Sequence, residues 1–130
     1  MSGRYLLDSN IVVALFAGEP DLLSHLKEAE EVFLPSVVIG ELYYGAFKSA
    51  RAVENVERIH RFVEVSVVLG CDGETARRYG QVKFDLSRKG RPITENDIWI
   101  AALAVQYNLT LVSRGAHFSE IEELTIERWQ

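Results

Sequence analysis

Cysteine is almost missing from this sequence, which contains Cys71 and no other. A single cysteine excludes an internal disulfide and favours a reducing compartment. The chain also has no Cys/His cluster, which argues against a zinc site.

Long hydrophobic runs are missing as well. Asp8, Glu41 or Glu64 interrupts the longest apolar stretches, so none approaches the roughly 20 residues that a membrane-spanning helix needs. The amino-terminal stretch lacks the charged start, apolar run and small-residue cleavage site of a signal peptide. We therefore expect a soluble, cytoplasmic protein that does not insert into a membrane.

An excess of positive charge is the third absence. The net charge is −5 and the isoelectric point is about 5.2, which argues against a protein that holds nucleic acid by general electrostatic attraction. It does not exclude a nuclease, because acids gathered at one site can bind divalent cations and reverse the local field.

The apolar pattern indicates an α/β protein. Among 130 residues 48% are hydrophobic, enough for one core, and we expect a single domain over residues 1–130. Helical segments separate short apolar strands, which are predicted at residues 5–7, 32–34, 66–69, 109–113 and 124–129. This alternation predicts a central, mainly parallel sheet covered by helices on both faces.

Three carboxylates stand in unusually apolar surroundings. Asp8 directly follows the first strand, at the end of a sheet where ligands bind, although it could simply cap the next helix. Glu41 shares its helix face with Val37, Val38 and Tyr44, so it must be neutralised, bound to a cation or paired with an arginine. Asp97 opens a helix that is apolar nearly all round, although Thr94 and Asp97 also have the spacing of a capping box.

These three acids predict a cation site for phosphodiester chemistry. Ionised carboxylates cannot crowd together without raised pKa values or a cation between them. Oxygen ligands favour hard ions, so Mg²⁺, or Mn²⁺, is the expected occupant. Such an ion would activate a water for attack on phosphorus, and Ser9 and Asn10 could position water or phosphate beside it.

Several segments together carry a family resemblance. They are Leu7-Asp8-Ser9-Asn10, residues 36–45 around Glu41, residues 95–102 and residues 111–118. In this order and spacing they resemble a PIN domain of the VapC-type toxin ribonucleases. The resemblance implies a three-layer α/β/α sandwich and a magnesium-dependent endoribonuclease that cleaves tRNA, including the initiator type. It also implies a homodimer, a VapB-type antitoxin whose tail blocks the site, and Asp8, Glu41 and Asp97 as catalytic, metal-binding residues.

Gly115 departs from the family pattern, which usually has an acid at this position. The fourth acid is therefore missing from the second metal position, where Glu95 or Ser113 could replace it. This absence also supports an alternative function, a PIN-like module that binds RNA and antitoxin without turnover. A phosphotransferase of the haloacid dehalogenase type is disfavoured, because it needs a second Asp where this chain has Asn10.

Basic side chains are expected to contact RNA or antitoxin. The candidates are Lys48, Arg51, Arg88, Lys89, Arg91 and Arg114.

Overall fold

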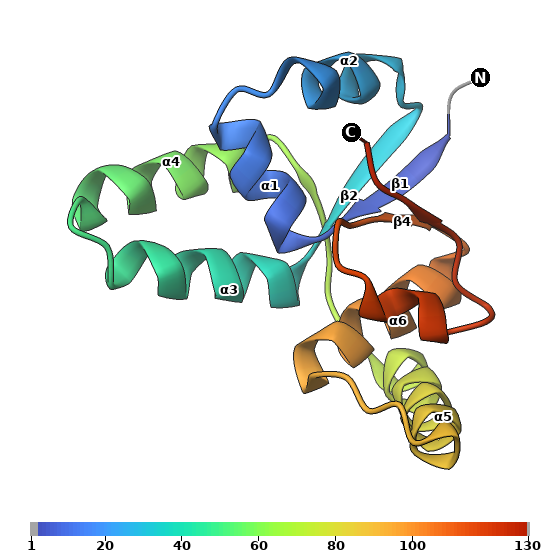
Figure 1. The fold of residues 1–130 in the computed structure, drawn as a ribbon. Helices are drawn as coiled ribbons and strands as arrows, with labels where there is room; N and C mark the ends of the chain where they lie inside the picture. The colour runs from blue at the N-terminus through green and yellow to red at the C-terminus, as the bar shows by residue number, and fades with distance from the viewer. Residues whose placement is uncertain (1–2, 130) are drawn as a thin grey trace.

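A five-stranded parallel sheet with the order β3-β2-β1-β4-β5 lies at the centre of the computed structural model, which describes residues 3–129 (Figure 1). The strands are β1 (Arg4–Leu7), β2 (Glu31–Pro35), β3 (Val67–Leu69), β4 (Thr110–Val112) and β5 (Ile126–Glu127). The helices are α1 (Ser9–Phe16), α2 (Pro20–Glu28), α3 (Ser36–Phe47), α4 (Ala52–Glu64), α5 (Gly73–Lys89), α6 (Glu95–Tyr107) and the 3-10 helix η1 (His117–Glu120).

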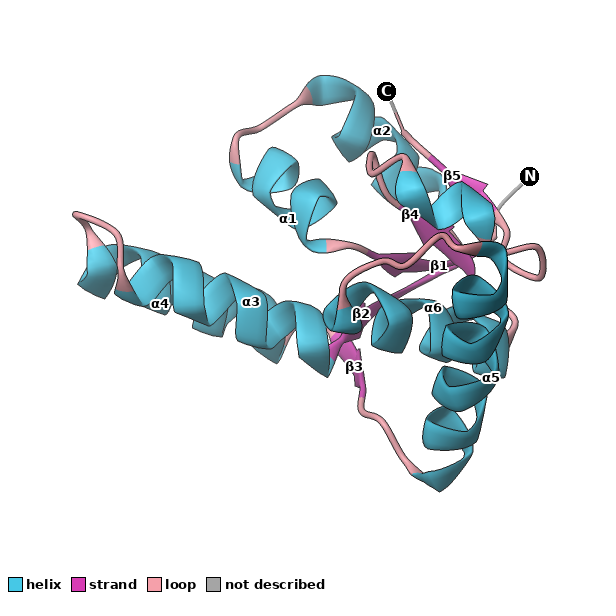
Figure 2. Ribbon diagram, turned by 60° about the horizontal axis from the view of Figure 1, so that its bottom comes forward, coloured by secondary structure: helices cyan, strands magenta, loops and turns pink. Residues whose placement is uncertain are grey.

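The strand order determines which helices cover which face. The chain moves outward from β1 to β2 and β3, then returns across the sheet to β4. Right-handed crossovers therefore place α1 to α4 on one face and α5 and α6 on the other, as Figures 1 and 2 show. The predicted α/β/α sandwich with a parallel sheet is confirmed.

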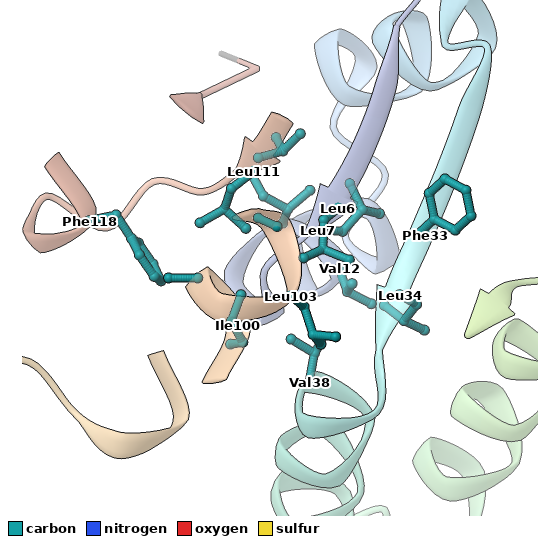
Figure 3. Close-up of a cluster of buried hydrophobic side chains, with 14 of the residues drawn as sticks. Leu6, Leu7, Val12, Phe33, Leu34, Val38, Ile100, Leu103, Leu111 and Phe118 are labelled. Carbon is teal, nitrogen blue, oxygen red and sulfur yellow. The ribbon is translucent and has the colours of Figure 1, made fainter. Parts of the chain in front are cut away.

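The central strands are apolar at successive positions because helices cover both faces of the sheet. Leu6, Leu7, Leu111 and Val112 are each at most 1% exposed. Side chains of α1, α3 and α6 surround them, and Figure 3 shows this cluster on both sides of the strands. Such burial on two faces holds the ends of β1 and β4 in fixed positions.

Helix α6 is apolar on most of its circumference because it is buried on most of it. Its residues from Ile98 to Ala104 are at most 2% exposed, except Trp99. Trp99 stacks on Tyr79 of α5, with ring centroids 4.1 Å apart. The first turn of α6, which carries Asp97, is thereby fixed relative to the sheet.

The last strand is shorter than the sequence predicts. We expected residues 124–129, whereas β5 spans Ile126–Glu127. Trp129 has a positive φ of 55° and its ring packs edge-on against Tyr5, with centroids 4.9 Å apart. The backbone turns there to bury the indole, and this ends the strand.

Helices α3 and α4 form an antiparallel pair that projects from the sheet (Figure 2). Tyr44, Phe47 and Val53, near the turn between these helices, are 66–85% exposed.

Among the helices of residues 3–129, none has the length and apolarity that a membrane crossing requires.

Candidate active site

Asp8 and Ser113 meet where the strand order reverses. They follow the adjacent parallel strands β1 and β4, whose chain connections lead in opposite directions across the sheet. Ligands of open α/β sheets bind beyond the carboxyl ends of strands at such a switch point. Ser113 Oγ donates to Asp8 Oδ2 at 2.7 Å, and the side chains are 0% and 5% exposed.

Asp8 caps α1, which was one of the two roles that the sequence left open, and it is also buried near the other acids. It is the N-cap of α1, and its Oδ1 accepts from the Ser9 backbone N–H at 2.8 Å. Burial raises the pKa of Asp8, and the nearby charge of Asp97 raises it further, while the bonds from Ser113 and Ser9 oppose this rise. The cap therefore coexists with a buried carboxylate that a cation would stabilise.

Glu41 has no arginine partner, contrary to the structural interpretation of its buried position. Within residues 3–129 its side chain accepts a hydrogen bond from Asn96, whose Nδ2 lies 3.4 Å from Oε2. Oε1 is buried and has no hydrogen-bond partner. Burial raises the pKa of Glu41, and the charges of Asp8 and Asp97 add to the rise. An orphaned carboxylate oxygen of this kind indicates a ligand.

The capping role at the start of α6 belongs to Thr94, not to Asp97. Thr94 Oγ1 accepts from the Asp97 backbone N–H at 3.4 Å. The Asp97 carboxylate instead contacts the imidazole of His117, with Oδ2 and Nε2 2.7 Å apart. The Asp97 side chain is 15% exposed, so it is accessible at the rim of the site.

The three carboxylates lie at the end of β1, in α3 and in α6, within electrostatic range of one another. Asp8 and Asp97 each raise the pKa of Glu41, and Asp97 raises that of Asp8. Within residues 3–129, however, no group of three or more His, Cys, Asp or Glu side chains is close enough to hold a metal by itself. Mg²⁺ usually keeps several waters and binds one or two carboxylates together with substrate phosphates. The oxygen donors and the orphaned Glu41 Oε1 therefore fit such an ion, although they do not form a closed cage.

The remaining predicted site residues lie at different places. Ser9 lies with Glu41 in the wall of one pocket, and Asn10 Oδ1 accepts from the Arg114 backbone N–H at 3.4 Å. Glu95 contacts α5, where Tyr79 donates to it and Lys83 Nζ lies 3.0 Å from Oε2. These two bonds lower the pKa of Glu95. Its carboxylate is therefore already bound outside the group of three.

Gly115 lies between the residues that hold Asp8 and Asp97. A Cβ built on Gly115 would be 3.4 Å from Ser113 Oγ and 3.6 Å from His117 Nε2, which is ordinary van der Waals contact. A side chain at this position would therefore extend beside the carboxylates, as expected for the missing fourth acid.

Arg114 is bound within the protein. Its guanidinium pairs with both oxygens of Glu19, at 2.8 and 3.2 Å, and contacts the carbonyl of Trp129 at 3.4 Å. These contacts connect the loop after β4 to the start of α2 and the end of the described chain. Arg114 is thus held by structural contacts, in contrast to an exposed RNA-binding arginine.

The other basic candidates lie in two separate regions. Lys48 and Arg51 are at the turn between α3 and α4, where Lys48 lies over the ring of Tyr44 and Arg51 pairs with Glu54. The second region, at the end of α5, contains Arg88, Lys89 and Arg91. Figure 2 shows these two ends of the molecule far apart.

A pocket of about 300 Å³ lies beside the carboxylates, between α1, α3 and α4. Glu41 and Ser9 form part of its wall, and Phe16, Leu42, Ala46 and Ile59 provide apolar lining. The pocket was not predicted, because it depends on how three helices pack. His117 lies within the segment 111–118, but no periodicity or spacing in the sequence links it to Asp97.

Comparison with known proteins agrees with this geometry. The family model for the PIN domain matches residues 5–124. Ribonuclease VapC2 of Haemophilus influenzae is 36% identical, covering 97% of this chain and 98% of the relative. The tRNA(fMet)-specific endonuclease VapC of Salmonella typhimurium is 29% identical, covering 97% and 98%.

Solved structures give the same result. A chain of DNA-bound VapBC from Salmonella typhimurium matches with a TM-score of 0.91 and 27% identity over 100% of both chains. A chain of VapBC2 from Rickettsia felis, bound to a promoter DNA fragment, matches with a TM-score of 0.90 and 28% identity over 98% of this chain and 99% of that one. The chain therefore belongs to the PIN domain family, among its VapC-type proteins.

Proposed function

We propose that this VapC-type PIN toxin, an endoribonuclease of a toxin-antitoxin pair, hydrolyses a tRNA phosphodiester bond with Mg²⁺ or Mn²⁺ held by Asp8, Glu41 and Asp97. The observation that carries the proposal is the buried, unpartnered Oε1 of Glu41 within electrostatic range of the two aspartates. Buried side-chain oxygens generally have a hydrogen-bond donor, so an unpartnered one beside two other acids favours a bound cation or an ordered water at that point.

The carboxylates fit a hard divalent cation in kind, because they offer oxygen donors. Asp8 uses one lone pair of each oxygen for Ser9 and Ser113, and each oxygen keeps a second for a ligand. A bound Mg²⁺ or Mn²⁺ would lower the pKa of a coordinated water and neutralise charge on the phosphate.

Glu41 is the residue best suited to take a proton from the attacking water. Its Oε1 has no hydrogen-bond donor within the described residues, so this oxygen can accept a proton from a water that the cation would coordinate, and Glu41 would hold the cation through that water. In the balanced reaction the water oxygen bonds to phosphorus, its proton passes to Glu41, and the leaving ribose oxygen takes a proton from solvent. Ser113 keeps Asp8 oriented throughout.

The substrate proposal is tRNA, including the initiator type. It is supported by relatives from Salmonella typhimurium and Shigella flexneri named tRNA(fMet)-specific endonuclease VapC, which are 29% and 30% identical. Basic residues at the α3–α4 turn and at the end of α5 lie at separate ends of the molecule. An extended, folded RNA is the kind of ligand that can span both regions.

The proposed partner is a VapB-type antitoxin, and the proposed assembly contains two copies of the toxin. Similar chains occur in structures named as VapBC complexes. The pocket beside Glu41 could accept an apolar side chain of an antitoxin tail, with a cationic residue next to the carboxylates. The exposed Tyr44, Phe47 and Val53 provide apolar surface that an assembly would cover.

Cleavage of a labelled initiator tRNA by the purified toxin, with Mg²⁺ and with EDTA, tests the proposal. We expect cleavage that EDTA abolishes and that Asp8→Ala reduces by at least a thousandfold, because a metal ligand is lost. Asp85→Ala removes a partly buried carboxylate on α5, away from the three acids, and should leave the rate unchanged. Binding of tRNA without cleavage would favour the alternative function, a binding module without turnover.

A further inference from the structure

The segment after β4 supplies two of the side chains that hold the aspartates. Ser113 bonds to Asp8, and His117, four residues later, bonds to Asp97. Asp8 follows β1 and caps α1, and Asp97 belongs to α6. One short segment therefore determines the orientation of carboxylates from two other elements.

His117 is held in place by its neighbour and not by its own burial. The His117 side chain is 50% exposed, whereas the next residue, Phe118, is fully buried and anchors η1 in the core. The two rings contact each other with centroids 5.4 Å apart. This arrangement keeps the imidazole beside Asp97 while leaving it open to solvent on the other side.

The contact leaves a defined part of Asp97 for another ligand. An ionised carboxylate only accepts hydrogen bonds, so His117 Nε2 is the donor to Oδ2. Oδ2 is the Asp97 oxygen that has a hydrogen-bond partner in the described chain, and Oδ1 is left for a cation. Ligating carboxylates are commonly oriented by such outer hydrogen bonds.

Gly115 provides the space for this arrangement. The Cβ of an acid there would lie 3.6 Å from Nε2 of His117, so its carboxylate would compete with Asp97 for the same N–H. The absence of a side chain at position 115 thus leaves the imidazole of His117 to Asp97.

We propose that His117 is a positioning residue that orients Asp97 for a divalent cation, and that it makes this a one-cation site without a fourth carboxylate. The inference rests on the proposed function, because it requires Asp97 to be a ligand. It differs from a competing interpretation in which His117 blocks Asp97 and must move away before a cation binds. The two interpretations predict opposite effects of removing the imidazole.

The test measures Mn²⁺ binding to the purified full-length toxin by electron paramagnetic resonance, without RNA. We expect one Mn²⁺ per chain in the wild type and binding weaker by about tenfold to a hundredfold in His117→Ala, as for other outer-shell partners. His117→Gln can place an amide N–H near the position of Nε2 and should recover much of the affinity. His60→Ala is the matched control, because His60 is a similarly exposed histidine on α4 whose ion-pair partner is Glu64.

Each other outcome has a distinct meaning. Unchanged or tighter Mn²⁺ binding in His117→Ala would overturn the positioning role and leave the nuclease proposal intact. Two Mn²⁺ per wild-type chain would overturn the one-cation part. If Asp97→Asn and wild type bound Mn²⁺ equally, both the inference and the metal part of the proposed function would fail. Thermal unfolding of each variant separates loss of binding from loss of the fold.

Discussion

Ser113 Oγ donates to Asp8 Oδ2 at 2.7 Å across 105 positions of the sequence. The bond connects adjacent strands at the switch point of the sheet, where the side chains are almost fully buried. It joins the packing of the core directly to the orientation of the first carboxylate.

Replacing Ser113 should therefore affect stability and activity together. Ser113→Ala removes a hydrogen bond to a charged group, which is worth about 1.5–3 kcal/mol, and frees Asp8 to rotate. We expect a lower free energy of unfolding in urea and a slower cleavage rate. Ser119→Ala is the control, because this serine lies nearby and bonds to the Ala116 carbonyl. Equal unfolding free energies for the two variants would show that the bond to Asp8 contributes nothing.

Asp8 is expected to cost stability that its function requires. Burial raises its pKa, so the folded state disfavours the carboxylate at neutral pH. Asp8→Asn should raise the melting temperature at pH 7 by a few degrees while abolishing cleavage, as for other destabilising active-site residues. Adding Mg²⁺ at about 100 times its Kd should stabilise the wild type by about 2.7 kcal/mol and should not stabilise the variant. A lower melting temperature for Asp8→Asn would show that the charged carboxylate, through its bonds from Ser9 and Ser113, stabilises the fold.

The pKa of Asp72 is shifted in the opposite direction from that of Asp8. Asp72 caps α5 through the Thr75 backbone N–H at 3.0 Å and accepts from Gln106 of α6 at 3.1 Å. These bonds lower the pKa of Asp72, so its contribution to stability is present above the ordinary aspartate value of about 3.9 and is lost as the pH falls through the lower folded value. Asp72→Ala should melt at a lower temperature than the wild type at pH 7, and the difference should shrink in acid.

Melting curves between pH 7 and pH 3 check this prediction. Asp85→Ala, on the same helix, removes a hydrogen bond from Gln81 and should show little difference at any pH. A constant gap for Asp72→Ala down to pH 3 would contradict the proposed linkage.

The sheet could be predicted from the sequence because strand and helix patterns are local. Leu6, Leu7, Leu111 and Val112 form apolar runs whose order alone implies a parallel sheet. The three acids were identifiable because a charge inside an apolar run is costly, wherever the chain later folds. This cost is a property of each residue and needs no knowledge of its partners.

The partners of these acids could not be predicted in the same way. Arg114 and Glu19 are 95 positions apart and Asp97 and His117 are 20 apart, and which pairs form depends on how loops leave the sheet. Arg114, which we expected to contact RNA or antitoxin, also forms an internal ion pair with Glu19, and Glu95 is bound to α5. Sequence spacing locates elements, whereas side-chain pairing follows from their packing.

Restoring an acid at position 115 tests the site most directly. A side chain at Gly115 has room beside Ser113 and His117, and the backbone there is not in the left-handed region. Gly115→Asp should fold and add a carboxylate to the rim. If the site gains a second cation position, isothermal titration calorimetry should detect a second Mn²⁺ per chain and the cleavage rate should rise. If the new carboxylate takes the N–H of His117, Asp97 loses its partner and first-site affinity should fall. Gly115→Asn fills the same space without charge and separates these electrostatic effects from crowding. Unchanged metal affinity and rate in Gly115→Asp would show that the site does not need a fourth carboxylate.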